Sequence, residues 1–142
     1  MFRLSAALAA FTLVAAPATA EATTLRGKTS QGRGITLTLG ADGVPTQVRF
    51  KWNLSCRKSK ETGPTKSSFL RPFDQATSDV LNDADTARRR YSGGLRVRQT
   101  GSISGQRAGQ SWSGTLSIKR PFSRRGRVFD TCKAEHITWS VS

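Results

Sequence analysis

The stretch ITLTLGADGVPTQVRFKWNLSC, residues 35–56, decides the fold of this chain. Within it, the runs 35–39 and 48–56 both alternate apolar and polar residues. A period of two is the pattern of a strand that buries one face and exposes the other. The turn between the runs contains Asp42-Gly43, and Asp-Gly is a strong signal for a tight hairpin. We therefore predict an antiparallel hairpin with one apolar face.

The same alternation recurs farther along the chain, at 95–98, 112–118 and 137–141. Gly, Pro, Asp and Ser residues separate these runs, which indicates about seven to nine short strands. This pattern predicts an all-β fold, either a single antiparallel β-sandwich or a small barrel. The predicted core residues are Ile35, Leu37, Phe50, Trp52, Leu116, Ile137 and Trp139.

Residues 57–67 are polar and contain Gly63-Pro64, and they fit a loop. Three further segments do not show this alternation. Residues 74–86 have Val80 and Leu81 as their only apolar anchors, and they fit a short helix or an irregular turn. Residues 102–110 are rich in glycine and fit a turn region, and residues 120–127 are basic and fit a connection between strands.

Residues 1–20 have the features of a secretory signal peptide. Arg3 supplies a positive start, an apolar stretch follows, and Ala18-Thr19-Ala20 is a small-x-small cleavage site. The apolar stretch is too short to span a membrane comfortably, and no later segment is long enough. We predict a cleaved signal peptide over 1–20 and one secreted β domain over 21–142. This domain would lie outside the cell or in the periplasm, with no transmembrane segment after cleavage.

The chain contains two cysteines, Cys56 and Cys132. An even count in an exported protein predicts a disulfide, and two cysteines allow one intramolecular pairing. A metal site is a poor alternative because His136 is the single histidine, whereas a structural zinc ion usually takes four ligands. We predict neither a metal site nor a cofactor.

The chain is strongly basic. Its 23 Lys and Arg against 9 Asp and Glu give a formal net charge of +14, and removal of Arg3 with the signal peptide leaves +13. Such a charge attracts anionic partners. Outside the cytoplasm these partners include anionic polysaccharide, teichoic acid, lipopolysaccharide and extracellular nucleic acid. The alternative is that the arginine-rich composition reflects a GC-rich genome and serves no ligand.

Several basic residues alternate with apolar ones along the predicted strands, which places them on one outer sheet face if their strands are neighbours. The alternative is that these charges only protect outer faces and edge strands from aggregation. Nucleic-acid-binding surfaces often expose aromatic rings on which bases stack. Here the three tryptophans fall on inward faces, and Tyr91 is the one ring expected to be exposed. The positive charge is therefore the only feature that favours nucleic acid as the partner. The residues predicted to bind an anion are Arg49, Lys51, Arg88, Arg89, Arg90, Arg96, Arg98 and Lys119.

No constellation of residues identifies a reaction. The chain has no nucleophile-elbow motif, and His136 is predicted on the outward face of the last strand, beside Glu135. We therefore predict no catalytic residue and favour a non-enzymatic binding module for anionic polymers or surfaces. A hydrolase of envelope polymers would need a pocket in which carboxylates or His136 converge. An extracellular inhibitor or interaction protein would show an apolar patch or a bare edge strand.

Three segments are distinctive in combination. They are TSQG at 29–32, FxWxxxC at 50–56, and GxxxDxCx6W at 126–139. Together they resemble a group of small, basic, secreted bacterial β-domain proteins, and the resemblance extends over nearly the whole mature chain. It implies secretion, a β fold and a bridge between Cys56 and Cys132. It carries no catalytic residues.

Overall fold

The computed structural model describes residues 21–59 and 63–142, so the predicted signal peptide lies outside the described residues. This part of the chain forms ten strands and a single-turn 3-10 helix, η1 (Ser92–Gly94), which confirms the predicted all-β fold. No helix in these two ranges is long and apolar enough to cross a membrane. The strands are β1 (Thr23–Thr29), β2 (Gly34–Leu39), β3 (Pro45–Asn53), β4 (Ser55–Cys56), β5 (Pro64–Leu70), β6 (Gln75–Ala76), β7 (Val80–Arg90), β8 (Leu95–Ala108), β9 (Ser111–Arg124) and β10 (Arg127–Val141).

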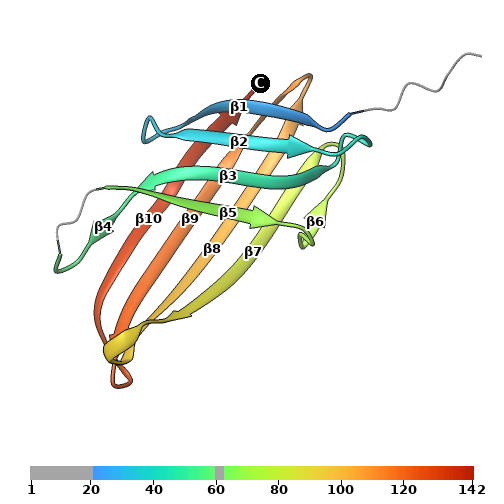
Figure 1. Cartoon of the computed structure of the whole chain (residues 1–142). Coiled ribbons are helices and arrows are strands. Elements are labelled where there is room, and N and C mark those ends of the chain that lie inside the picture. Colours follow the sequence, from blue (N-terminus) through green and yellow to red (C-terminus); the bar gives the residue numbers. More distant parts are fainter. Residues whose placement is uncertain (1–20, 60–62) are drawn as a thin grey trace, which may run out of the picture.

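All ten strands belong to one antiparallel sheet. Nine of them follow the order β5-β3-β2-β1-β10-β9-β8-β7-β6, and β4 pairs with β10 outside this path. The strands β1, β2, β3 and β5 form a front layer that crosses over a back layer made of β7 to β10 (Figure 1). Because β1 continues the hydrogen-bonded ladder into β10, the two layers are parts of one sheet that curls into a half-barrel.

The core lies between the two layers. All seven predicted core residues are buried, and the three tryptophans are 0–3% exposed. β7 and β8 add Leu81 and Ile103. Glycine in β8 makes room for the largest rings, since a Cβ at Gly105 would lie 2.6 Å from the indole of Trp139. Gly105 and Trp139 both belong to the back layer, so this glycine lets the indole lie across β9 toward β8. Between the layers, a Cβ at Gly101 of β8 would lie 3.0 Å from the ring of Phe69 in β5, so glycine also lets the two layers approach closely there.

Four segments differ from the prediction. β5 begins at Pro64, inside the predicted loop 57–67, because β3 offers it a hydrogen-bonding partner. Residues 74–86 hold β6 and part of β7 in place of a helix or turn, because β8 offers a hydrogen-bonding partner along the whole of β7. β8 continues to Ala108 and β9 to Arg124, where the sequence predicts a turn region and a connection. Each of these strands is paired on both sides, and this pairing overrides the weak strand propensity of glycine.

The strand β10 ties the two layers together. It pairs with β9 along one side, and along the other side with β1 near Trp139 and with β4 near Cys132. The disulfide joins Cys56 to Cys132, which lie directly opposite each other in the ladder, so the predicted bridge is confirmed. The sheet is therefore covalently closed on itself at one point of the half-barrel.

Candidate anion-binding sites

The outer surface of the front layer is basic. Alternation points every second residue of β2 and β3 into the core and leaves Arg49 and Lys51 exposed to solvent. Cross-strand register places Arg26 and Arg49 on either side of Thr36, and Lys51 directly opposite Lys66. We call this surface the basic sheet face, and its exposed cations are Arg26, Lys28, Arg49, Lys51 and Lys66.

A hollow of about 700 Å³ lies in the basic sheet face. Arg26, Arg49 and Lys51 line it together with Thr36 and Gly34. A Cβ at Gly34 would meet nothing within 4 Å, so the space beside this residue is open. The hollow thus combines flexible cations with hydroxyl and backbone groups that can also contact an anion.

The strands of the basic sheet face, β1, β2, β3 and β5, carry no acidic residue. The ion pairs between described residues are Arg71–Asp42 and Lys133–Glu135, and neither includes a cation of this face. Like charges on adjacent strands destabilise a sheet. The described residues do not compensate this repulsion, and binding of an anion would relieve it.

The eight residues predicted to bind an anion lie on three surfaces, and the single basic face does not form. The reason is that β3 and β8 belong to different layers and are separated in the sheet by β2, β1, β10 and β9. Arg49 and Lys51 lie on the basic sheet face, and Arg89 lines a cavity between the layers. The others are exposed on the outer surface of the back layer: Arg88, Arg90, Arg96, Arg98 and Lys119.

Three cations of the basic sheet face are not predicted from the sequence. Arg26 and Lys28 do alternate with Leu25, but Gly27 interrupts the apolar pattern that would have marked a strand. Lys66 falls in a polar segment that resembles a loop, and it becomes part of β5 because β3 offers a partner to the whole of that strand. A search for weak alternation around single apolar residues could have found the first two.

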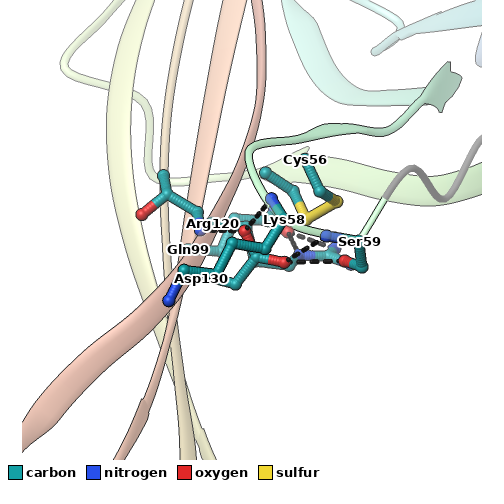
Figure 2. The surroundings of a disulfide bond; sticks show 8 residues. Cys56, Lys58, Ser59, Gln99, Arg120 and Asp130 are labelled. Carbon is teal, nitrogen blue, oxygen red and sulfur yellow. Dashed lines mark hydrogen bonds between the residues drawn. A yellow bond between two sulfur atoms is a disulfide. The ribbon is translucent and has the colours of Figure 1, made fainter.

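The disulfide forms part of a hydrogen-bonded corner (Figure 2). Asp130 accepts hydrogen bonds from the Ser59 hydroxyl (2.7 Å) and from the backbone N–H groups of Ser59 (3.1 Å) and Lys58 (3.0 Å). These bonds, led by the one from the hydroxyl, lower the pKa of Asp130 to about 2. The sulfur atoms of Cys56 and Cys132 lie within 4.8 Å of this carboxylate, but they are bonded to each other. We assign the corner a structural role, because it holds the segment after β4 against β10.

The titratable groups that a hydrolase would need do not meet in the hollow. His136 is exposed at a bulge of β10, has a φ of 55°, and donates its backbone N–H to the Ser117 hydroxyl. Of the described residues, those that line the hollow include neither His136 nor Asp130 nor Glu135. The hollow therefore offers positive charge for binding rather than an acid and a base.

No protein-family model, no curated protein and no solved structure matches this chain. The resemblance carried by the segments 29–32, 50–56 and 126–139 stays a prediction. Function is inferred below from charge, burial and geometry.

Proposed function

We propose that the protein is a secreted, non-enzymatic module that binds anionic polymers on the basic sheet face. The observation that carries the proposal is the charge of the front layer: five exposed cations lie on β1, β3 and β5, and none of the four front-layer strands contains a carboxylate. Neighbouring strands lie about 4.8 Å apart, so these cations span a width over which a polymer presents several anionic groups. Several contacts made by flexible side chains give affinity without requiring one ligand shape.

Secretion is part of the proposal. The predicted signal peptide supports it, and so does the disulfide, because disulfides form and persist in oxidising compartments. The partners available in that setting are anionic polysaccharide, teichoic acid, lipopolysaccharide and extracellular nucleic acid. These polymers share repeated anionic groups, which is the chemistry that the basic sheet face would recognise.

The experiment compares two variants that remove the same charge from different surfaces. The probes are a short DNA duplex and heparin, and binding is followed by fluorescence anisotropy over a salt series. The first variant, the face variant, carries Arg26→Gln, Arg49→Gln and Lys51→Gln. The matched control carries Arg88→Gln, Arg96→Gln and Arg98→Gln on the outer surface of the back layer.

We expect the face variant to bind both probes more weakly and the matched control to lose little. For the duplex, the slope of log K against log salt should fall by about 0.9 for each phosphate contact removed. Equal losses in the two variants would show that net charge drives binding, and they would overturn the proposal. Binding that does not depend on salt would do the same.

A further inference from the structure

The half-barrel is open along one side, between β5 and β7. In the described part of the chain, β5 pairs with β3, and β7 pairs with β8 and over two residues with β6, so these two strands do not pair with each other. A hydrogen bond from the Gln99 side chain of β8 to the Ser67 hydroxyl of β5, 3.3 Å long, crosses between the layers there. At this opening the front and back layers are therefore in contact through side chains, and not through backbone hydrogen bonds between β5 and β7.

A cavity of about 490 Å³ lies at this opening, and we call it the seam cavity. Its volume falls in the range of small-molecule binding sites. Leu95, Val97 and Phe122 give it an apolar wall, and Tyr91, which is 50% exposed, also lines it. Val97 lies opposite Arg89 on one neighbouring strand and opposite Phe122 on the other. A cation therefore stands directly beside the apolar wall.

Arg120 supplies a second positive charge to the seam cavity. Its guanidinium lies 5.1 Å from the ring centroid of the buried Trp52, and its Nε donates to Gln99 Oε1 at 2.9 Å (Figure 2 shows Gln99 and Arg120). Its Nη2 donates to the same oxygen. The indole N–H of Trp52 donates to the Ser67 hydroxyl at 3.0 Å and fixes the ring beneath the guanidinium. Neutral groups thus hold Arg120, which keeps further N–H donors free because a guanidinium has five.

The charge of Arg120 is partly buried, and no carboxylate of the described residues lies within ion-pair distance of it. Burial lowers the pKa of Arg120. Among the described residues, neither Arg120 nor Arg89 forms an ion pair. A guanidinium withdrawn from water without a counter-charge loses hydration energy. An anion placed in the seam cavity would restore that energy.

We propose that the seam cavity binds a small organic carboxylate. Its carboxylate accepts hydrogen bonds from Arg120, Arg89 and Lys66 supply further positive charge, and its apolar or aromatic body packs against Val97 and Phe122. A guanidinium can form two parallel hydrogen bonds with a carboxylate, which suits a group held in one orientation. Lys66 lines both this cavity and the hollow of the basic sheet face, whereas Arg89 and Arg120 line the seam cavity and not the hollow. The two proposals can therefore be tested separately through Arg89 and Arg120.

The first test compares 1-naphthoate with its neutral analogue 1-naphthamide. Binding to the full secreted chain is measured by isothermal titration calorimetry and by quenching of tryptophan fluorescence, to which Trp52 beneath Arg120 contributes together with Trp112 and Trp139. We expect 1-naphthoate to bind at least about tenfold more tightly than the amide, because only the acid pairs with the guanidinium. Equal affinities, or no binding of the acid at about 1 mM, would overturn the proposal.

The second test removes the cations one at a time. Arg120→Gln should weaken 1-naphthoate binding by about tenfold or more, and Arg89→Gln by a smaller factor. The matched control Arg98→Gln removes a charge from the outer surface of the adjacent strand and should leave the affinity unchanged. If Arg120→Gln fails to fold, the comparison of Arg89→Gln with Arg98→Gln decides, since both side chains are exposed. Equal losses in those two variants would contradict the proposal.

Two further variants separate the alternatives. The face variant should keep its affinity for 1-naphthoate while it loses affinity for the DNA duplex, so either proposal can fail without the other. Glu61 lies in the segment 60–62, outside the described residues, and Glu61→Gln tests whether the chain itself supplies the anion. Binding of 1-naphthoate by Glu61→Gln alone, and not by the wild type, would overturn the proposal. Equal binding by both proteins would support it.

Discussion

The back strands β7 to β10 run from one end of the half-barrel to the other, but the front layer crosses them at one end only (Figure 1). We call the end beneath the front layer the covered end and the other the open end. At the covered end, β9 buries Trp112, Leu116 and Ile118 to 0–1% exposure beneath the front layer. At the open end, the same alternation turns Arg120 and Phe122 inward, and both keep contact with a cavity. Arg120 lies at the margin of the front layer, over Trp52 of β3, and it faces the seam cavity on its other side. The comparison teaches that an inward-facing position becomes a core position only where the second layer encloses it fully.

Strand length explains the difference between the ends. The strands β7 to β10 have 11 to 15 residues, whereas the front-layer strands β1, β2, β3 and β5 have 6 to 9. The back strands therefore extend beyond the front layer, as the lower part of Figure 1 shows. Polar and charged side chains are tolerated on the inner face of this extension, because they are not enclosed by apolar neighbours.

Truncation of a covered ring should have the largest effect. We expect Trp139→Ala to lower the free energy of unfolding by about 4 kcal/mol, since it leaves a void between the layers. Phe122→Ala at the open end should lower it by about 1 kcal/mol or less. Guanidinium chloride unfolding at equilibrium measures both.

The substitution Trp139→Phe is the control for this comparison. The indole N–H of Trp139 has no hydrogen-bond partner among the described residues, so Trp139→Phe removes volume without breaking a hydrogen bond. It should destabilise the protein much less than Trp139→Ala. Similar losses for Trp139→Ala and Phe122→Ala would contradict the distinction between a covered and an open end.

Loss of the disulfide should have an intermediate effect, concentrated near the open end. The bridge links residues 76 apart in the sequence, and we expect the Cys56→Ala, Cys132→Ala variant to be less stable by about 2–4 kcal/mol. Hydrogen exchange should accelerate first in β4 and in the adjoining part of β10, because β4 is only two residues long and has no other anchor of this strength. Wild-type protein treated with a reductant is the control. Acceleration confined to the β1–β10 pairing would refute this expectation.

The smallest effect should come from Asp130 and should depend on pH. Its pKa is lowered to about 2 in the folded protein, below the usual value near 4 of an unfolded chain. The stabilisation from its hydrogen bonds is therefore fully present above about pH 4 and is lost as the pH falls through about 2. Thermal unfolding of wild type and Asp130→Asn at a series of pH values should show a difference that shrinks over this range. A difference that stays constant from pH 5 to about pH 2 would show that Asp130 does not carry this pH dependence.

The sequence predicts the parts of the fold that depend on local pattern. The hairpin follows from alternation and from Asp42-Gly43, and its inward residues from Ile35 to Trp52 are buried. Leu54 and Cys56, predicted on the same face, are half-buried, and Ser55–Cys56 pairs with β10 instead. β7 was beyond such reasoning, because its polar sequence becomes a strand only through pairing with β8. Because β7 is not predicted, the sequence also could not assign Arg88 and Arg89 to opposite sides of a strand.

The candidate sites were predictable to a smaller extent. Arg49 and Lys51 are exposed as alternation indicates, but their neighbours Arg26 and Lys66 follow from strand order and register. The sequence does not distinguish Arg120 from its neighbours, because it is the first residue of the basic segment 120–127, which is predicted to be a connection between strands. Its role depends on Trp52, a residue 68 positions away, which only the crossing of the two layers brings beneath it.

By itself, the sequence determined the β class, the inward and outward sides of its clearest strands, the one possible intramolecular disulfide and the excess of positive charge. The tertiary structure alone decided which strands are neighbours, which inward positions are covered, and therefore where cations gather without a counter-charge. The physical reason is that side-chain alternation is a property of the local backbone, with a period of two. Strand order and coverage depend on pairing between distant segments, such as Gly27 with Val141, and no local pattern records that choice.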